Sequence, residues 1–409
     1  YADMIPNKIS VNKKLVLYTS DFGTGYVVGG SLGATEDDIE QIDSFAYTVC
    51  HSAGSVKPVD FLSAEAFGID VPRRCRHCKG CKECGFRASA LTWTEARELA
   101  EIEKGLSLDT AKKIWTATYP FQEDPIVLKN NHPQAMACMA SLEKRLKKEG
   151  QIPAFNEQFN DAIKRGVFQE LSKEEQDGYI GPVNYVTITE AYKDGEHTTT
   201  PLRLCMNSSM RYQGRSLNDC LMKGPSALNN IYSVLLNFRS YPVAFVKDLS
   251  KFYQSVLASE RDQHLRRVLW REGDQDKPPK IYKTRTVNFG DKPAGCIALT
   301  AVRNTADLYQ NIDPGAAEKL KRDNYVDDVA SGDNNKESAL ATSANMDRIV
   351  QMGGFTFKST IMSGDVGEPR RVLGTGWNTE HDTLFIEVKV NTCPKRKGIR
   401  TGPNIEFKI

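Results

Sequence analysis

The stretch Val243-Ala-Phe-Val-Lys-Asp-Leu-Ser-Lys-Phe-Tyr-Gln-Ser-Val256 decides the fold around it. A short apolar run, typical of a buried strand, leads to Asp248, and the aromatic residue Tyr253 follows. Further along the chain, Asn324-Tyr-Val-Asp-Asp-Val-Ala-Ser331 places two carboxylates between apolar residues, which predicts a tight hairpin. A strand end and a hairpin turn are rigid supports, so both segments can present acidic side chains at fixed positions.

These carboxylates suit one kind of chemistry. Transfer of a phosphoryl group is limited by charge and positioning, and two metal ions about 4 Å apart can stabilise both the attacking and the leaving oxygen. Mg²⁺ prefers carboxylate oxygens, so at least two acidic side chains must converge. The sequence therefore predicts a two-metal site at Asp248, Asp327 and Asp328. A solvated turn is the plain alternative, and an EF-hand is excluded because Val329 stands at a ligand position.

The rest of the chain mixes helical and strand-like patterns without strict βαβ alternation, which favours an α+β fold. Strand-like runs occur near the N-terminus at 14–18 and 26–28, and a further strand is predicted at 241–246. Helices are predicted at 92–116, 134–149, 155–171, 216–239, 293–311 and 339–351.

At this point the chain resembles reverse transcriptases, and more closely the polyproteins of Pao/BEL-type long-terminal-repeat retrotransposons. The resemblance covers roughly residues 115–400 and rests on motifs in the family's order. Beside the two aspartate segments, these motifs are Thr198-Thr-Thr-Pro-Leu-Arg203, Ser216-Leu-Asn-Asp-Cys-Leu-Met-Lys-Gly-Pro225, Asn288-Phe-Gly290, Gly353-Gly-Phe355 and Leu373-Gly-Thr-Gly-Trp377.

The resemblance implies a role for each matching residue. Asp248 and Asp327 would bind two Mg²⁺ or Mn²⁺ ions with support from Asp328, and Lys358 would protonate pyrophosphate. The residues implied to bind the incoming nucleotide are Arg203, Tyr253 (a steric gate against a 2′-hydroxyl), Phe289, Gly290 and Tyr325. The implied primer grip consists of Leu373, Gly374 and Trp377. An ordinary exposed lysine at 358 and a core tryptophan at 377 are the plain alternatives.

Two departures from the family pattern affect the expected nucleotide contacts. Asn207 lies four residues after Arg203, where relatives usually carry Asp. After Gly290 the chain continues Asp-Lys-Pro-Ala, so Pro293 comes earlier than in the usual pattern. Neither departure touches the three aspartates.

The resemblance also implies a domain organisation. Residues 1–70 would be the C-terminal part of a protease-like β domain, and 71–127 a Cys-rich basic loop and helical linker. Residues 128–390 would form the fingers and palm of a right-hand polymerase, and 391–409 the start of a connection region. No Asp-Thr-Gly or Asp-Ser-Gly occurs, so we expect no protease activity. RNase H and integrase are expected downstream in a longer polyprotein.

Cys75, Cys78, Cys81 and Cys84 follow a C-x2-C-x2-C-x2-C pattern in a basic setting. Such knuckles suit tetrahedral zinc, and this is the site we predict. Closely spaced cysteines also occur in iron–sulfur ligation, and a cluster without metal is the third alternative.

The bulk composition limits the partners. The net charge is +2 over 409 residues, so nucleic acid must be bound through local basic patches rather than an overall positive field. No apolar run reaches the ~20 residues of a membrane span, so we expect no membrane partner. We take the setting to be intracellular, and the resemblance implies a cytoplasmic retroelement particle. The expected partners are an RNA or DNA template-primer and dNTPs. Two other hypotheses remain: a truncated, inactive element that binds nucleic acid, and a structural polyprotein segment organised by the cysteines.

Overall fold

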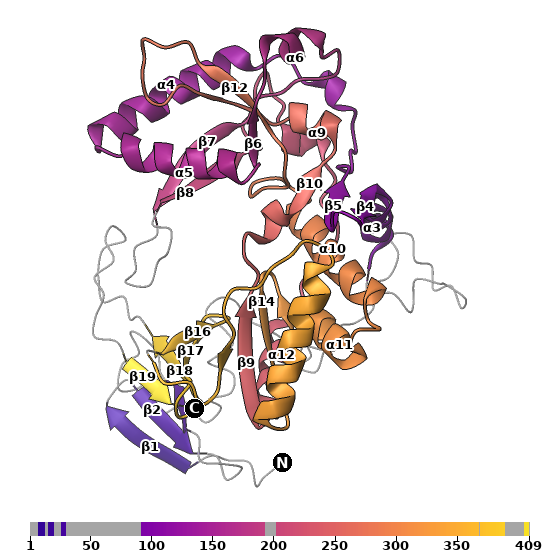
Figure 1. Cartoon of the computed structure of the whole chain (residues 1–409). Coiled ribbons are helices and arrows are strands. Elements are labelled where there is room, and N and C mark those ends of the chain that lie inside the picture. Colours follow the sequence, from indigo (N-terminus) through magenta and orange to yellow (C-terminus); the bar gives the residue numbers. More distant parts are fainter. Residues whose placement is uncertain are drawn as a thin grey trace, which may run out of the picture.

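The structure is a computed structural model that describes residues 91–192, 202–367 and 369–388, and the backbone of short strands at 7–12, 15–19, 26–29 and 405–408. Helices and several small sheets alternate irregularly along the chain, which confirms the predicted α+β class. Figure 1 shows one group of helices and strands around α4, α5 and β6–β8, and a second group around β9, β14 and α10–α12. The proposed domain boundaries stay predictions.

A four-stranded antiparallel sheet carries the aspartate segments. Its order is β13-β14-β9-β15, with β9 (Val243–Asp248), β13 (Asn324–Tyr325), β14 (Asp328–Asp333) and β15 (Ile361–Met362). The predicted strand at 241–246 and hairpin at 324–329 are thus confirmed, with β9 ending on Asp248.

Both faces of this sheet are buried. Successive side chains of a strand point to opposite faces, so Phe245 joins the large core while Ala244 and Val246 join a second, smaller core. Helix α12 (Lys336–Gln351) packs on the first face, with α10 (Ala294–Leu308) and α11 (Pro314–Arg322) beside it. Helix α8 (Ile231–Ser240) packs against β14 and β9. Two-sided burial explains why β9 reads as a nearly continuous apolar run.

Local signals set the ends of these helices. Asn335 caps α12 by accepting a hydrogen bond from the backbone N–H of Ser338, and Asn230 and Asp313 cap α8 and α11 in the same way. The buried residues of α12 recur at the spacing of one helix face: Ala339, Thr342, Ser343, Met346, Ile349 and Val350.

The other group of elements is built on an aromatic core. Its elements are α4 (His132–Lys148), α5 (Ile152–Lys164), β6 (Phe168–Glu170), α6 (Lys173–Gly178), β7 (Thr187–Tyr192), β8 (Leu202–Asn207), α9 (Glu260–His264), β11 (Arg267–Trp270) and β12 (Lys280–Thr284). Phe155, Phe159 and Trp270 are nearly fully buried. Phe159 stacks on Phe168 and packs edge-to-face on Tyr282, and Phe155 packs at a tilt against Trp270. Burial of each large side chain contributes about 1.5–3 kcal/mol, so this cluster fixes α5 on the sheet of β11, β12 and β6.

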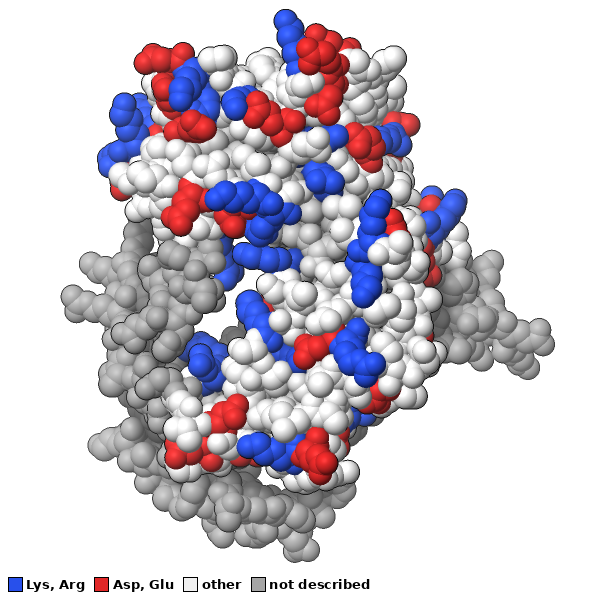
Figure 2. Space-filling view, viewed as in Figure 1, with Lys and Arg blue, Asp and Glu red and all other residues white. Residues whose placement is uncertain are grey.

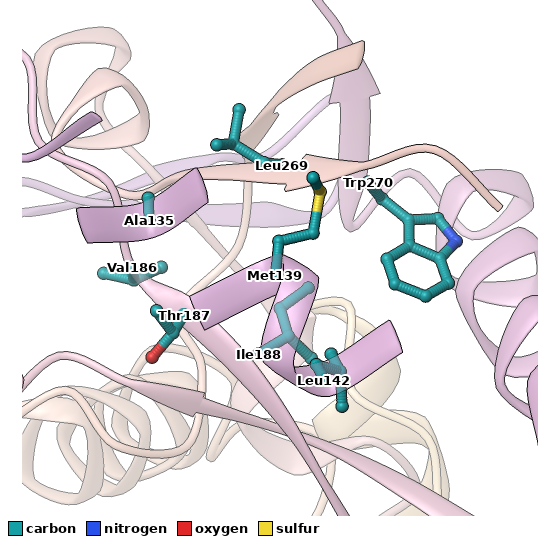
Figure 3. Close-up of a pocket in the computed structure, with 8 residues that line it drawn as sticks. All are labelled: Ala135, Met139, Leu142, Val186, Thr187, Ile188, Leu269 and Trp270. Atoms are coloured by element: carbon teal, nitrogen blue, oxygen red, sulfur yellow. The ribbon is translucent and has the colours of Figure 1, made fainter. Parts of the chain in front are cut away.

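A small gap remains where α4 packs on β7 and β11 (Figure 3). The lining side chains are mostly apolar, with Met139, Ile188 and Trp270 among them. The gap has room for about 10 Å³, which is roughly the space of one water molecule. It is a packing defect away from the aspartates.

Other helices and strands complete the described structure. They are β1 (Asn7–Asn12), β2 (Leu15–Thr19), β3 (Tyr26–Gly29), α3 (Trp93–Gly105), β4 (Leu106–Asp109), β5 (Ile114–Ala117), η4 (Pro125–Val127), α7 (Leu217–Cys220), η5 (Phe252–Ser255), β10 (Val256–Ala258), β16 (Arg370–Val372), β17 (Thr375–Asn378), β18 (Thr383–Val388) and β19 (Ile405–Lys408). The strands predicted at 14–18 and 26–28 correspond to β2 and β3.

Three helix predictions were too long. The helix expected over 92–116 ends at Gly105, and a β-hairpin follows because Trp115 and Ala117 alternate into the core beside β10. The helix expected over 155–171 ends at Lys164, and Phe168 begins strand β6. In 216–239, Gly224 has φ +79° and precedes Pro225, so a short α7 and the later α8 are separate.

Candidate active site

The three aspartates lie together at one end of the four-stranded sheet. Asp248 on β9 and Asp328 on β14 are directly paired across the two strands. Tyr325 pairs with Asp328 across the hairpin, which leaves Val326 and Asp327 as its two-residue turn. The backbone N–H of Leu249 donates to the carbonyl of Asp327 over 2.7 Å, so the turn is tied to the end of β9.

The turn that carries Asp327 is conformationally unusual. Val326 has φ +58°, in the left-handed region that β-branched residues avoid. A positive φ at the first turn position fits a type II′ hairpin, where Gly is preferred. Strain of this kind persists only where the surroundings hold it, and such positions cluster at functional sites.

Negative charge is concentrated at this end of the sheet. Burial raises the pKa of Asp328 to about 7, and the charges of Asp327 and Asp248 add to the shift. Burial also raises the pKa of Asp327, with a further contribution from Asp248. The site therefore favours a bound proton or a cation over three free carboxylates.

Lys358 is the nearest cation to this cluster. Its Nζ lies 2.8 Å from Asp248 Oδ1, and its backbone N–H donates to the carbonyl of Asp248 over 2.8 Å. Asp248 Oδ1 is buried and accepts no hydrogen bond of normal geometry, so this ion pair is its compensation within the described residues. Lys358 therefore lies at the aspartate cluster, while 56% of its side chain stays exposed.

Further cations surround the aspartates. Arg203, on the exposed side of β8, and Lys358 both lower the pKa of Asp327 against the raising effect of burial. Burial lowers the pKa of Lys251, and the positive charges of Arg165, Lys358 and Arg203 contribute. Figure 2 shows Lys and Arg side chains gathered around the hollow between the two groups of elements.

Sequence reasoning missed Lys251 and Arg165. Lys251 stands three residues after Asp248 and, with a left-handed φ of +51°, is the N-cap residue of η5. Its position next to the Asp248 motif could have identified it from the sequence. Arg165 ends α5, donates to Gln254 Oε1 over 2.5 Å and pairs with Asp161, and no motif singles it out.

Tyr253 and Phe289 form an aromatic pair beside the aspartates. Their ring centroids lie 4.7 Å apart with the planes at 63°, and Phe289 remains about half exposed. Burial raises the pKa of Tyr253, and the charge of Asp327 adds to the shift, which places the phenol within electrostatic reach of that carboxylate. Gln254 donates to Asn288 Oδ1 over 3.1 Å and links the two segments.

Gly290 lies against the strand that carries Arg203. Its φ is +94°, and a Cβ at this position would stand 2.1 Å from the carbonyl oxygen of Met206 on β8. Only glycine allows this close approach. The aromatic pair and β8 are therefore joined through one backbone contact.

The unusual residue after Gly290 has a structural role. Asp291 is buried and accepts hydrogen bonds from Tyr119 Oη (2.6 Å), Arg266 Nη1 (2.8 Å) and Ser208 Oγ (2.5 Å). Arg266 and Asp291 have fully buried side chains. Since Ser208 directly follows β8, this network fixes the Phe289–Gly290 loop to the end of that strand. Asn207 accepts a hydrogen bond from the backbone of Ser209.

The expected primer grip forms a second hairpin. Leu373 and Gly374, with φ +49° and +88°, are the two-residue turn between β16 and β17. Trp377 is fully buried, packs edge-to-face on Phe238 at 5.1 Å and donates from Nε1 to Asp382 over 2.9 Å. The tryptophan is a core residue on the face of the sheet opposite α12.

The donor set suits a hard divalent cation, although the carboxylates are not pre-assembled around one point. Among the described residues, no three His, Cys, Asp or Glu side chains converge as a ready-made metal site. Burial and the neighbouring carboxylates raise the pKa values of Asp327 and Asp328, so a bound divalent cation would stabilise their charged forms. Cys75, Cys78, Cys81 and Cys84 lie outside the described residues.

Comparison with solved structures gives distant likenesses. No protein-family model and no curated protein matches the chain. The fold is similar to a foamy viral protease-reverse transcriptase in complex with RNA/DNA hybrid, with a TM-score of 0.40 and 14% sequence identity. The likeness covers 56% of this chain and 26% of that one, so it does not establish a shared activity. Within the described part of the chain, every helix is too short or too polar to cross a membrane.

Proposed function

We propose that the chain is the polymerase core of a reverse transcriptase from a Pao/BEL-type retrotransposon polyprotein. It would add deoxynucleotides to the 3′-hydroxyl of a primer on an RNA or DNA template. The observation that supports this best is the direct pairing of Asp248 with Asp328, with Asp327 at the adjoining turn. The sequence motifs are the reason for proposing a Pao/BEL-type element in particular.

The proposed metal ligands are Asp248 and Asp327, with Asp328 supporting the pair. Two bound Mg²⁺ or Mn²⁺ ions would supply charge stabilisation for the attacking and leaving oxygens. The side chains of the protein would bind the triphosphate and supply a proton. Arg203 and Lys251 would attract the triphosphate, and Lys358, within reach of Asp248, would deliver a proton to the leaving pyrophosphate.

The proposed nucleotide pocket is built on the aromatic pair. Tyr253 would stand where a 2′-hydroxyl would project and so exclude ribonucleotides. Phe289, Gly290 and Tyr325 would shape the rest of the pocket. The turn at Leu373 and Gly374 would contact the primer, while Trp377 supports that turn from the core.

The wider assignments follow from the family alone. They are a template-primer and dNTPs as partners, RNase H and integrase regions downstream, and a cytoplasmic retroelement particle as location. The spacing of Cys75, Cys78, Cys81 and Cys84 separately supports a proposed structural zinc ion at these residues.

One observation favours a second candidate, a nucleic-acid-binding module without catalysis. Asp248 is paired with Lys358, and the described residues include no three His, Cys, Asp or Glu side chains already placed to hold one metal ion. If metal binding cannot displace this ion pair, the basic surroundings would still bind a polyanion.

Primer extension on an RNA template with dNTPs and Mg²⁺ or Mn²⁺ tests the proposal. We expect extension by the wild type and by Asp276→Asn, which changes an exposed carboxylate, and at least about a thousandfold loss in Asp327→Asn. Folded protein that binds primer-template in an anisotropy assay but never extends it would favour the binding module. Loss of both binding and extension would reject both candidates.

A further inference from the structure

The residue before Asp248 is a fully buried lysine. Lys247 has 0% side-chain exposure, and alternation along β9 turns it away from Asp248, toward the face covered by α12. Burial lowers the pKa of Lys247, and the charge of Asp347 acts in the opposite direction. A charged group in this place costs desolvation energy, so its contacts must offset that cost.

Those contacts fall into two sets. Toward α12, Lys247 Nζ donates to Ser343 Oγ (2.8 Å) and the Ser343 carbonyl (3.1 Å), and pairs with Asp347 Oδ2 at 2.8 Å. Toward the segment after α12, it donates to Thr360 Oγ1 over 2.9 Å and lies 4.9 Å from the centre of the Phe357 ring.

Phe357 and Thr360, the two residues of the second set, stand before and after Lys358 in the chain. The same segment is held from its other edge by β9, since Ser250 N–H donates to the Thr356 carbonyl and Lys358 N–H to the Asp248 carbonyl, each over 2.8 Å. Residues 356–360 are therefore fixed between the backbone after Lys247 and the Lys247 ammonium. In this arrangement Lys358 Nζ reaches Asp248 Oδ1.

A methionine would fill the same volume without the cost of burying a charge, and replacement of buried ion pairs by apolar residues is often neutral or stabilising. What an apolar side chain cannot do is bind Thr360 and α12 at once. We propose that Lys247 is a positioning residue that holds the 356–360 segment, and with it Lys358, against Asp248. The consequence for nucleotide addition rests on the proposed function; the positioning itself does not.

Hydrogen exchange tests the positioning without any activity. In Lys247→Met and in Thr360→Val, which removes the hydroxyl that lies 2.9 Å from both Lys247 Nζ and Ser343 Oγ, we expect amides of 356–360 to exchange about tenfold faster than in the wild type. Faster exchange in Lys247→Met is the result specific to the ammonium. Amides of β14 should stay unchanged. Thr342→Val is the matched control: it makes the same change at a partly buried hydroxyl, but Thr342 lies on α12 and donates to Asp333, not to the 356–360 segment. Unchanged exchange of 356–360 in Thr360→Val and in folded Lys247→Met would overturn the inference.

Kinetics then separates positioning from general stability. Where the wild type extends primers, Thr360→Val should lower kcat about tenfold with little change in the KM for primer-template. In a Lys358→Gln background the same substitution should change kcat less than about twofold, because the group it positions is gone. Equal effects in both backgrounds would contradict an action through Lys358. A wild type without extension would reject the proposed function and leave the exchange result standing.

Discussion

Asp248 and Asp328 lie directly opposite each other on the antiparallel strands β9 and β14. Alternation along both strands turns the two carboxylates to the face of Ala244, Val246 and Ala330, away from α12. Directly paired residues on one face have Cβ atoms about 4.5–5.5 Å apart, so the two charges repel each other unless a proton or a cation lies between them. This relationship leads to the first prediction.

Asp328→Asn should stabilise the protein at pH 8 and have much less effect at pH 5. The folded-state pKa of Asp328, about 7, is above the ~3.9 of an unfolded aspartate. Ionisation therefore opposes folding, and stability is lost as the pH rises between these values. Thermal unfolding in EDTA at both pH values measures this, with the exposed Asp276→Asn as control. The same melting-temperature change at pH 5 and pH 8 would contradict the raised pKa.

Gly290→Ala should destabilise the protein by more than Gly364→Ala. Both glycines have a strongly positive φ (+94° and +88°), which costs any L-residue about 1–2 kcal/mol. Gly364 has open space around it, whereas a Cβ on Gly290 meets the Met206 carbonyl. Urea unfolding of both variants isolates the contact with β8, and equal losses would show that this approach is not tight.

Val326→Gly should leave the free energy of unfolding within about 1 kcal/mol of the wild type, because relief of the left-handed φ offsets the added flexibility of glycine. Val329→Gly, in the same hairpin but fully buried, should cost about 3 kcal/mol or more. Urea denaturation of the pair checks this. A loss at Val326 as large as at Val329 would mean that packing, not backbone strain, dominates the turn.

Tyr253→Val should raise ribonucleotide incorporation relative to deoxynucleotide incorporation by roughly 10- to 200-fold, the range available to a single pocket contact. The ratio of kcat/KM values for a dNTP and the matching rNTP gives the answer. Tyr282→Phe, a buried tyrosine of the other aromatic core, should leave the ratio unchanged. An unchanged ratio in Tyr253→Val would remove Tyr253 as a steric gate.

Asp291→Asn should cost about 3–5 kcal/mol, because it leaves Arg266 as a buried charge without its anionic partner. Chemical denaturation measures the loss, with Asp276→Asn again as the exposed control. A loss below about 1 kcal/mol would show that Tyr119 and the Thr286 carbonyl satisfy Arg266 on their own.

The sequence by itself determined the elements whose signals are local. The apolar run before Asp248 predicted a buried strand, the Asp327–Asp328 segment predicted a hairpin, and the helix predicted at 339–351 covers most of α12. It failed where a helical composition was overruled by tertiary pairing, as at Trp115, whose place beside β10 depends on a partner far along the chain.

Only the tertiary structure decided what lies around the aspartates. It paired Asp248 with Asp328, brought Lys358 Nζ within 2.8 Å of Asp248, and turned Lys247 toward Thr360. It also made Trp377 a core residue and Asp291 the centre of a buried network. The physical reason is that strand register and the packing of distant segments determine which charged side chains come together. Neither can be inferred from the local spacing of polar and apolar residues.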